Sequence, residues 1–126
     1  MLVGTGTDLI EIARIRQSIE RFGTRFLERI FTAGEIAYCQ RKKNAAESYA
    51  GRFAAKEAAA KALGTGIARG VSWREIEVVR RPGERPTLHL SGRAAVRAAM
   101  IGAHAASVSI SHSRDLALAT VLLESA

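Results

Sequence analysis

Three charged residues in two segments have the types and spacing expected of a metal and phosphate site. Asp8 follows two glycines in LVGTGTDLI, and Glu57 and Lys61 stand one helical turn apart in FAAKEAAAKALGTG. Mg²⁺ prefers oxygen ligands and usually takes one or two carboxylates together with phosphate oxygens and water. A lysine binds phosphate as a point charge. Asp8, Glu57 and Lys61 are therefore candidates for binding a divalent cation and a phosphorylated substrate.

The same residues have structural interpretations that spacing alone leaves open. Asp8 and Glu11 have the spacing of a capping box, in which Asp8 would be the N-cap of the next helix. Glu57 and Lys61 could form a helix ion pair contributing about 0.2–0.5 kcal/mol. The many alanines around this pair argue against a solvated face, which usually carries more charge. Lys56, on a different side of the helix, is expected to be an ordinary solvated lysine.

The segment SVSISHS at 107–113 alternates strictly, which is typical of a strand with two different faces. His112 shares one face with apolar residues, where a histidine is usually a core or edge residue, and Ser111 lies on the other face. One strand cannot supply a Ser-His-Asp triad. The glycines at 64–66 lack the spacing of a Walker phosphate loop, so Gly64 is expected to end a helix.

Basic residues accumulate near the start of the chain. The formal charge of +7, from 19 Lys+Arg against 12 Asp+Glu, favours anionic partners. Arg14 and Arg21 lie two turns apart on one side of a predicted helix, and Arg25 follows a break at Gly23. They form either an ordinary basic surface or a docking patch for an acidic partner. Nucleic acid is the weaker candidate, because the chain has no recognised nucleic-acid motif and no aromatic-rich basic strand.

The surrounding elements predict one α+β domain over residues 1–126, with a small, largely antiparallel sheet, one long helix and several short ones. The long helix covers 45–63, begins at an Asn44 cap and ends at Gly64. In the first strand, Gly4 and Gly6 are expected to leave open space beside Asp8. Strands are predicted at 2–10, 73–81, 86–90, 107–113 and 116–123, a loop at 64–70, and further helices at 11–22, 24–31, 33–41 and 92–101.

Cysteine content and hydropathy predict a cytoplasmic protein. A single cysteine, Cys39, excludes an intramolecular disulfide and fits a reducing compartment. The first residues lack the basic start of a signal peptide, and no apolar run approaches the roughly 20 residues that span a bilayer. Aromatic residues are only 6% of the chain, so little bulky core is available and a subunit interface is favoured.

Three segments together resemble a known family. GTDLIEIARI at 6–15, GRFAAKEAAAKALGTGI at 51–67 and SISHSRDLALATV at 109–121 are similar to the signature segments of holo-[acyl-carrier-protein] synthases, the small-subunit 4′-phosphopantetheinyl transferases. The resemblance implies the 4′-phosphopantetheinyl transferase fold. It also implies Mg²⁺-dependent transfer of 4′-phosphopantetheine from coenzyme A to a serine of apo acyl carrier protein, a step in fatty acid biosynthesis. A non-catalytic basic module that binds nucleotides or nucleic acid is the alternative.

The resemblance also implies roles for individual residues. Asp8 and Glu57 would bind Mg²⁺, and Lys61 would lie near the coenzyme A phosphates. All three residues would act in catalysis. A homotrimer with active sites between subunits is implied, without nucleic-acid or membrane partners, and the general base is left open. Further residues are expected beside coenzyme A, namely Arg52, Lys61, Gly64, Ser111 and His112. The docking patch for the acidic carrier protein is expected at Arg14, Arg21 and Arg25.

Overall fold

A computed structural model describes residues 1–67 and 69–126, so Ala68 in the predicted 64–70 loop lies outside the described residues. The elements follow the predicted order, and the α+β class is confirmed. The strands are β1 (Leu2–Glu11), β2 (Ile76–Val79), β3 (Thr87–Leu90), β4 (Ala105–His112) and β5 (Leu116–Glu124). The helices are α1 (Ile12–Phe22), α2 (Thr24–Ile30), α3 (Ala33–Gln40), α4 (Ala45–Ala62) and α5 (Gly92–Met100), with a 3₁₀ turn η1 (Trp73–Glu75).

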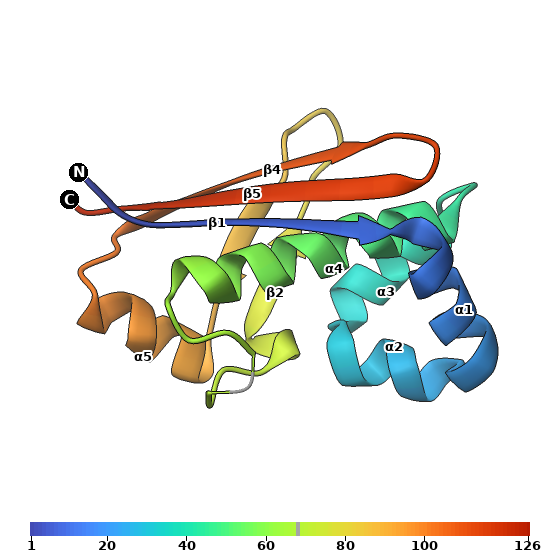
Figure 1. The fold of residues 1–126 in the computed structure, drawn as a ribbon, viewed down its shortest axis with the longest axis horizontal. Helices are drawn as coiled ribbons and strands as arrows, with labels where there is room; N and C mark the ends of the chain where they lie inside the picture. Colours follow the sequence, from blue (N-terminus) through green and yellow to red (C-terminus); the bar gives the residue numbers. More distant parts are fainter. Residues whose placement is uncertain (68) are drawn as a thin grey trace.

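The larger sheet has the strand order β1-β5-β4, and both neighbouring pairs are antiparallel (Figure 1). The register places Asp8 opposite Ala119 and His112 opposite Ala117. Because side chains alternate along a strand, one face of this sheet is buried against α4 and the other is open. The buried face of β5 consists of Ala117, Ala119, Val121 and Leu123. Strands β2 and β3 form a separate antiparallel pair.

Helix α4 lies along β1 because two glycines allow the backbones to touch (Figure 1). A Cβ on Gly6 would overlap the Ala58 carbonyl oxygen, and a Cβ on Gly4 would overlap the Ala62 carbonyl oxygen. Glycine is the residue that permits such close backbone approach. The predicted open space beside Asp8 is therefore wrong, because the backbone of α4 fills it and brings the C-terminal half of this helix to the strand.

The ends of α4 carry the predicted signals. Asn44 Oδ1 accepts a hydrogen bond from the Glu47 amide at 3.2 Å, which satisfies one free donor of the first turn. Gly64 adopts a φ of 79°, as a helix-ending glycine does. The Arg97 Nε donates to the Leu63 carbonyl at 2.8 Å and so satisfies a backbone acceptor at the end of the helix.

The remaining helices occupy the two ends of α4. Helices α1, α2 and α3 gather at its N-terminal end, and α5 lies towards its C-terminal end (Figure 1). The chain termini lie side by side, and the Ser125 amide donates to the Met1 carbonyl at 2.8 Å. In the part of the chain that the structure describes, no helix has both the length and the apolar character needed to cross a membrane.

Lys56 is fully buried, so its predicted solvated position is wrong. Its Nζ lies 2.7 Å from Glu35 Oε1 and donates to the carbonyl oxygens of Trp73 at 2.9 Å and Ile76 at 2.6 Å. The second Glu35 oxygen accepts a hydrogen bond from the Val78 amide at 2.9 Å. Burial lowers the pKa of Lys56, although the Glu35 carboxylate opposes this effect. The small alanines of α4 allow α3 and η1 to close over this lysine.

The predicted strand at 73–81 is shorter in the structure. Residues 73–75 form η1, and only Ile76–Val79 form β2. Ser72 and Glu75 form a capping box at this point, which turns the chain before the strand begins.

Candidate functional site

Strand β1 and the C-terminal half of α4 line a pocket of about 590 Å³, called here the carboxylate pocket after Asp8 and Glu57. Lys61 lines it as well, and its Nζ lies 3.0 Å from Asp8 Oδ1 and 3.1 Å from the Thr7 carbonyl oxygen. The Lys61 side chain is 51% exposed and that of Asp8 is 17% exposed. The structure therefore brings Asp8, Glu57 and Lys61 together in one pocket, and the Lys61 ammonium remains accessible from solvent.

Neither structural interpretation of these residues holds. Helix α1 begins at Ile12, and the N-cap position is Glu11 rather than Asp8. Pairing with β5 continues through Glu11, so Asp8 still belongs to the strand. Lys61 forms its salt bridge with Asp8 and not with Glu57 within the helix. These charges therefore connect two elements instead of stabilising one helix.

Glu57 is a partly buried carboxylate that lies near the negative charge of Asp8. Burial raises the pKa of Glu57, and the nearby negative charge of Asp8 raises it further, while Lys61 acts in the opposite direction. A divalent cation between the two carboxylates would relieve their repulsion. Within residues 1–67 and 69–126, no three His, Cys, Asp or Glu side chains come together. Two carboxylates beside an open pocket suit Mg²⁺, which completes its coordination with water and phosphate oxygens.

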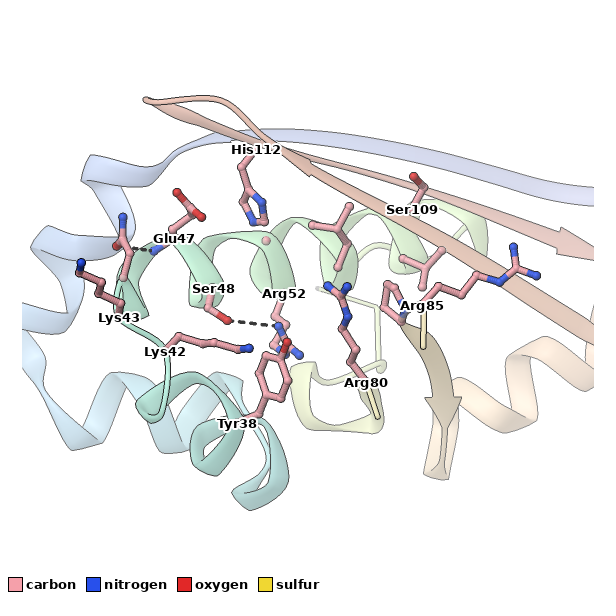
Figure 2. A pocket seen from close by; sticks show the side chains of 15 residues that line it. Tyr38, Lys42, Lys43, Glu47, Ser48, Arg52, Arg80, Arg85, Ser109 and His112 are labelled. Carbon is pink, nitrogen blue, oxygen red and sulfur yellow. Dashed lines mark hydrogen bonds between the residues drawn. The ribbon is translucent and has the colours of Figure 1, made fainter. Parts of the chain in front are cut away.

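A second pocket of about 620 Å³ lies at the other end of α4, and we call it the basic pocket (Figure 2). Figure 2 shows its side chains converging from α4, from the segment after α3, from β4 and from the residues that flank the β2–β3 turn. Its cationic and imidazole side chains are Lys42, Lys43, Arg52, Arg80, Arg85 and His112.

Arg52 is the most buried cation of the basic pocket, at 6% exposure. One terminal nitrogen donates to Ser48 Oγ at 3.3 Å, and its Nε has no hydrogen-bond partner in the structure. An unpaired buried guanidinium is costly unless an anion binds it. His112 packs against Gly51, where a Cβ would lie 2.9 Å from Nε2, so this glycine makes room for the imidazole.

Three residues expected beside coenzyme A lie outside the basic pocket, and one of them, Lys61, lines the carboxylate pocket. Ser109 lines the basic pocket, whereas Ser111 is exposed on the open side of β4. Gly64 ends α4, and its nearest side-chain neighbour is Arg97. Lys42 and the arginines around the β2–β3 turn were not among the predicted site residues. The density of cations at 41–43 and 80–85 is the signal in the sequence that could have indicated them.

The two pockets open on different sides of α4. Glu57 follows Arg52 by five positions and Lys61 follows it by nine, which corresponds to rotations of about 140° and 180° around the helix. The two pockets share no lining residue. One helix therefore presents the carboxylate pocket on one side and the basic pocket on the other.

Two of the three arginines of the predicted docking patch line the carboxylate pocket or the pocket beside it. Arg14 lines the carboxylate pocket, and Arg25 lines an adjoining pocket of about 560 Å³. Phe26 lines both. The guanidinium of Arg21 lies over the Phe22 ring, 5.2 Å from its centroid. Arg14 and Arg25 therefore lie at two adjoining pockets that share Phe26, one of which contains Asp8 and Glu57.

Comparisons with known proteins agree with one another. Residues 4–121 match the model of the 4′-phosphopantetheinyl transferase superfamily. A holo-[acyl-carrier-protein] synthase from Koribacter versatilis is 55% identical over 124 residues, which is 98% of this chain and 99% of the relative. The crystal structure of the Neisseria meningitidis synthase is 35% identical, with a TM-score of 0.89 and coverage of 98% and 99%. The Helicobacter pylori synthase, solved in complex with coenzyme A, is 36% identical, with a TM-score of 0.84 and coverage of 95% and 99%.

Proposed function

Because this chain belongs to the 4′-phosphopantetheinyl transferase superfamily, we propose that it is a holo-[acyl-carrier-protein] synthase. It transfers 4′-phosphopantetheine from coenzyme A to a serine hydroxyl of apo acyl carrier protein. The serine oxygen bonds to the phosphorus that carries the pantetheine group and loses its proton to a base that is left open, and the bond from that phosphorus to the bridging oxygen breaks with its electron pair going to that oxygen. Adenosine 3′,5′-bisphosphate leaves. The observation that supports this proposal most directly is the convergence of Asp8, Glu57 and Lys61 in one pocket.

Asp8 and Glu57 are the residues that would hold Mg²⁺. When bound, the ion would neutralise and orient the diphosphate of coenzyme A. The two carboxylates come from β1 and α4, whose close backbone contact fixes the separation between them. Catalysis of phosphoryl-type transfer depends mainly on such positioning and on charge stabilisation.

Lys61 would stabilise the charge that develops on the leaving phosphate. Its ammonium is held at Asp8 by a salt bridge, yet half of the side chain is exposed to solvent. A lysine in this position can move from Asp8 to a phosphate oxygen without crossing the core. The nucleophile comes from the carrier protein, so the transfer requires no nucleophilic serine from this chain.

The basic pocket would bind the phosphorylated nucleotide end of coenzyme A through Arg52 and His112. Since this pocket and the carboxylate pocket open on different sides of α4, we place each active site between two subunits of a homotrimer. The open face of the larger sheet supports this assembly, because Leu9 and Leu118 lie opposite each other there and are both exposed. Ser111, also exposed, would reach a substrate held by the neighbouring subunit. The cytoplasmic location stays a prediction from the sequence.

The transfer assay tests the function. The protein is mixed with coenzyme A, Mg²⁺ and apo acyl carrier protein, and the carrier is weighed by mass spectrometry. We expect a gain of one phosphopantetheine, which EDTA abolishes. A carrier whose acceptor serine is replaced by alanine is the control and should gain no mass.

A non-catalytic nucleic-acid-binding module is the alternative function. It predicts binding to nucleic acid that weakens log-linearly with salt. EDTA would barely change such binding, because the phosphate backbone contacts need no bound metal. An unmodified carrier together with this salt dependence would replace the transferase proposal.

A further inference from the structure

Tyr38, at the end of α3, lies between two cations of the basic pocket (Figure 2). The guanidinium carbon of Arg52 lies 3.9 Å from the centroid of its ring, and the Lys42 ammonium lies 4.6 Å from the same centroid. Both distances are within the range of a cation–π interaction. The two cations come from different segments, since Arg52 is on α4 and Lys42 follows α3. The Tyr38 ring is thus a common support for both.

The Tyr38 ring is important for Arg52 because this buried cation has no salt bridge among the described residues. Among the residues that the structure describes, the salt bridges join Lys56 to Glu35 and Lys61 to Asp8. Arg52 is not among these pairs, although it is almost fully buried. Its guanidinium instead donates a hydrogen bond to Ser48 and lies over the Tyr38 ring.

An aromatic ring suits a binding pocket better than a carboxylate does. A carboxylate would fix Arg52 but would also cancel the charge that attracts an anion. The negative face of a ring fixes a guanidinium by a weaker attraction and leaves its hydrogen-bond donors free.

The hydroxyl of Tyr38 responds to the same two cations. Burial raises the pKa of Tyr38, but hydrogen bonding of its hydroxyl to Lys42 and Arg52, together with their positive charges, outweighs this effect, so that the pKa is lowered overall. This agrees with the geometry, which places both cations beside the same side chain.

We propose that Tyr38 is a positioning residue whose ring holds Arg52 and Lys42 together so that both can bind phosphate oxygens of one nucleotide. This inference rests on the proposed function, because it concerns the site assigned to coenzyme A. Tyr38 does not touch the reacting atoms. It acts on the affinity for the nucleotide through the two cations.

Two substitutions separate the ring from the hydroxyl. Tyr38→Phe keeps the ring, and Tyr38→Leu removes it while leaving an apolar side chain. The probe is adenosine 3′,5′-bisphosphate, and its binding is measured by calorimetry. We expect Tyr38→Leu to weaken binding by about tenfold, the effect of losing cation–π contacts. Tyr38→Phe should bind within about twofold of the wild type, which is rescue by the conservative residue.

Kinetics and a double-mutant cycle test whether Tyr38 acts through Arg52. In the transfer assay, Tyr38→Leu should raise the KM for coenzyme A and leave kcat close to that of the wild type. Tyr38→Leu should also weaken nucleotide binding less when it is introduced into Arg52→Ala than into the wild type, because the effects of substituting two residues in contact are not additive. Full additivity of the two substitutions would overturn the proposal.

Other outcomes would overturn it as well. These are wild-type affinity in Tyr38→Leu, equally weak binding in Tyr38→Phe, and a wild-type protein that does not bind the probe. If the probe binds with the expected dependence on Tyr38 but no phosphopantetheine is transferred, the positioning role stands and the proposed function fails.

Discussion

Lys56 donates from a fully buried ammonium to Glu35 and to two backbone carbonyls, and so satisfies all three of its protons. The interactions join α4 to α3 and to the start of β2. The carbonyl oxygen of Trp73 is one of the two backbone acceptors, and its ring stacks on Phe53 with ring centroids 4.8 Å apart. Since Phe53 lines the carboxylate pocket, this lysine stabilises the structure behind the candidate site.

Replacing Lys56 by methionine should destabilise the protein strongly. Removal of one partner from a buried ion pair leaves the other charge uncompensated, which typically costs about 3–5 kcal/mol. The free energy of unfolding, measured by urea denaturation, should fall by about this amount in Lys56→Met. Lys43→Met, at an exposed lysine, is the matched control and should change it by no more than about 0.5 kcal/mol. Equal stability of the two variants would contradict the role given to Lys56.

The two lysines of the KEAAAK segment show what the sequence could predict at single residues. The motifs predict one site for Lys61, Asp8 and Glu57, and the three side chains line one pocket in the structure. The salt bridge between Lys61 and Asp8 could not be predicted, because it depends on the contact between α4 and β1. The burial of Lys56 was missed for the same reason, since its partner Glu35 belongs to another helix.

At the scale of elements, Glu75 links η1 to the N-terminus of α5. One of its carboxylate oxygens accepts from the Ser72 amide at 2.8 Å, and the other accepts from the Arg93 amide at 2.6 Å. The bond from Ser72 is the main cause of a lowered pKa at Glu75, with the Arg93 amide adding to it and burial opposing both. The negative charge also lies where the helix dipole of α5 favours it.

Glu75→Gln should therefore show a stability defect that depends on pH. Because the folded pKa lies below the ordinary value near 4.5, the stabilisation is complete above that value and is lost as the pH falls below it. At neutral pH the variant should lose about 0.3–1 kcal/mol of unfolding free energy. The difference in unfolding free energy between the variant and the wild type should disappear in acid, as measured by urea denaturation across pH.

Glu84→Gln is the control for this experiment, since the Glu84 side chain is exposed in the turn between β2 and β3. It removes the same charge and should leave stability unchanged at each pH. A gap between wild type and Glu75→Gln that widens in acid would contradict the capping role.

Helices α1 and α2 present the arginines assigned to the carrier protein. Reversing Arg14 and Arg21 to glutamate should raise the KM for the carrier by about tenfold or more, because like charges would then face the acidic partner. Calorimetry should show unchanged binding of coenzyme A. The double variant Arg16→Glu and Arg74→Glu makes the same charge change at other exposed positions, and we expect it to affect the carrier KM much less. Weakened coenzyme A binding in the Arg14 and Arg21 variant would refute the docking assignment.

The order and type of the elements could be predicted because their signals are local. Periodicity identified the helices, and the Asn44 cap and Gly64 marked the two ends of α4. The boundary at 73–81 was wrong, because the Ser72–Glu75 capping box formed a turn in a segment rich in β-branched residues. The basic pocket was not predicted as a whole, since its side chains converge from segments that lie far apart in the sequence.

At the scale of the whole molecule, the larger sheet has one face without a helix. Exposed leucines lie on this face among threonines, with Leu9 58% exposed and Leu118 and Leu122 39% and 38% exposed. Exposed leucines gathered on one sheet face favour an interface. The location of two complementary pockets on different sides of α4 also favours sites completed by a neighbouring subunit.

The protein should therefore behave as a trimer in solution, as measured by light scattering. Leu118→Lys should give monomers, because a buried lysine without a partner is costly, and it should reduce transfer with little loss of secondary structure. Val96→Lys introduces the same change at an exposed apolar residue of α5 and should remain trimeric. An active monomer would remove the shared-site proposal.

The most direct measurement compares the mass of apo acyl carrier protein after incubation with coenzyme A, Mg²⁺ and either wild type or Glu57→Gln. If the carboxylate pocket performs the transfer, wild type adds one phosphopantetheine and Glu57→Gln is slower by about 10²–10³-fold, as expected when one charge-stabilising group is removed. The variant should keep the wild-type circular dichroism spectrum. Equal rates of phosphopantetheine addition by the two proteins would contradict the assignment of the active site to Asp8, Glu57 and Lys61.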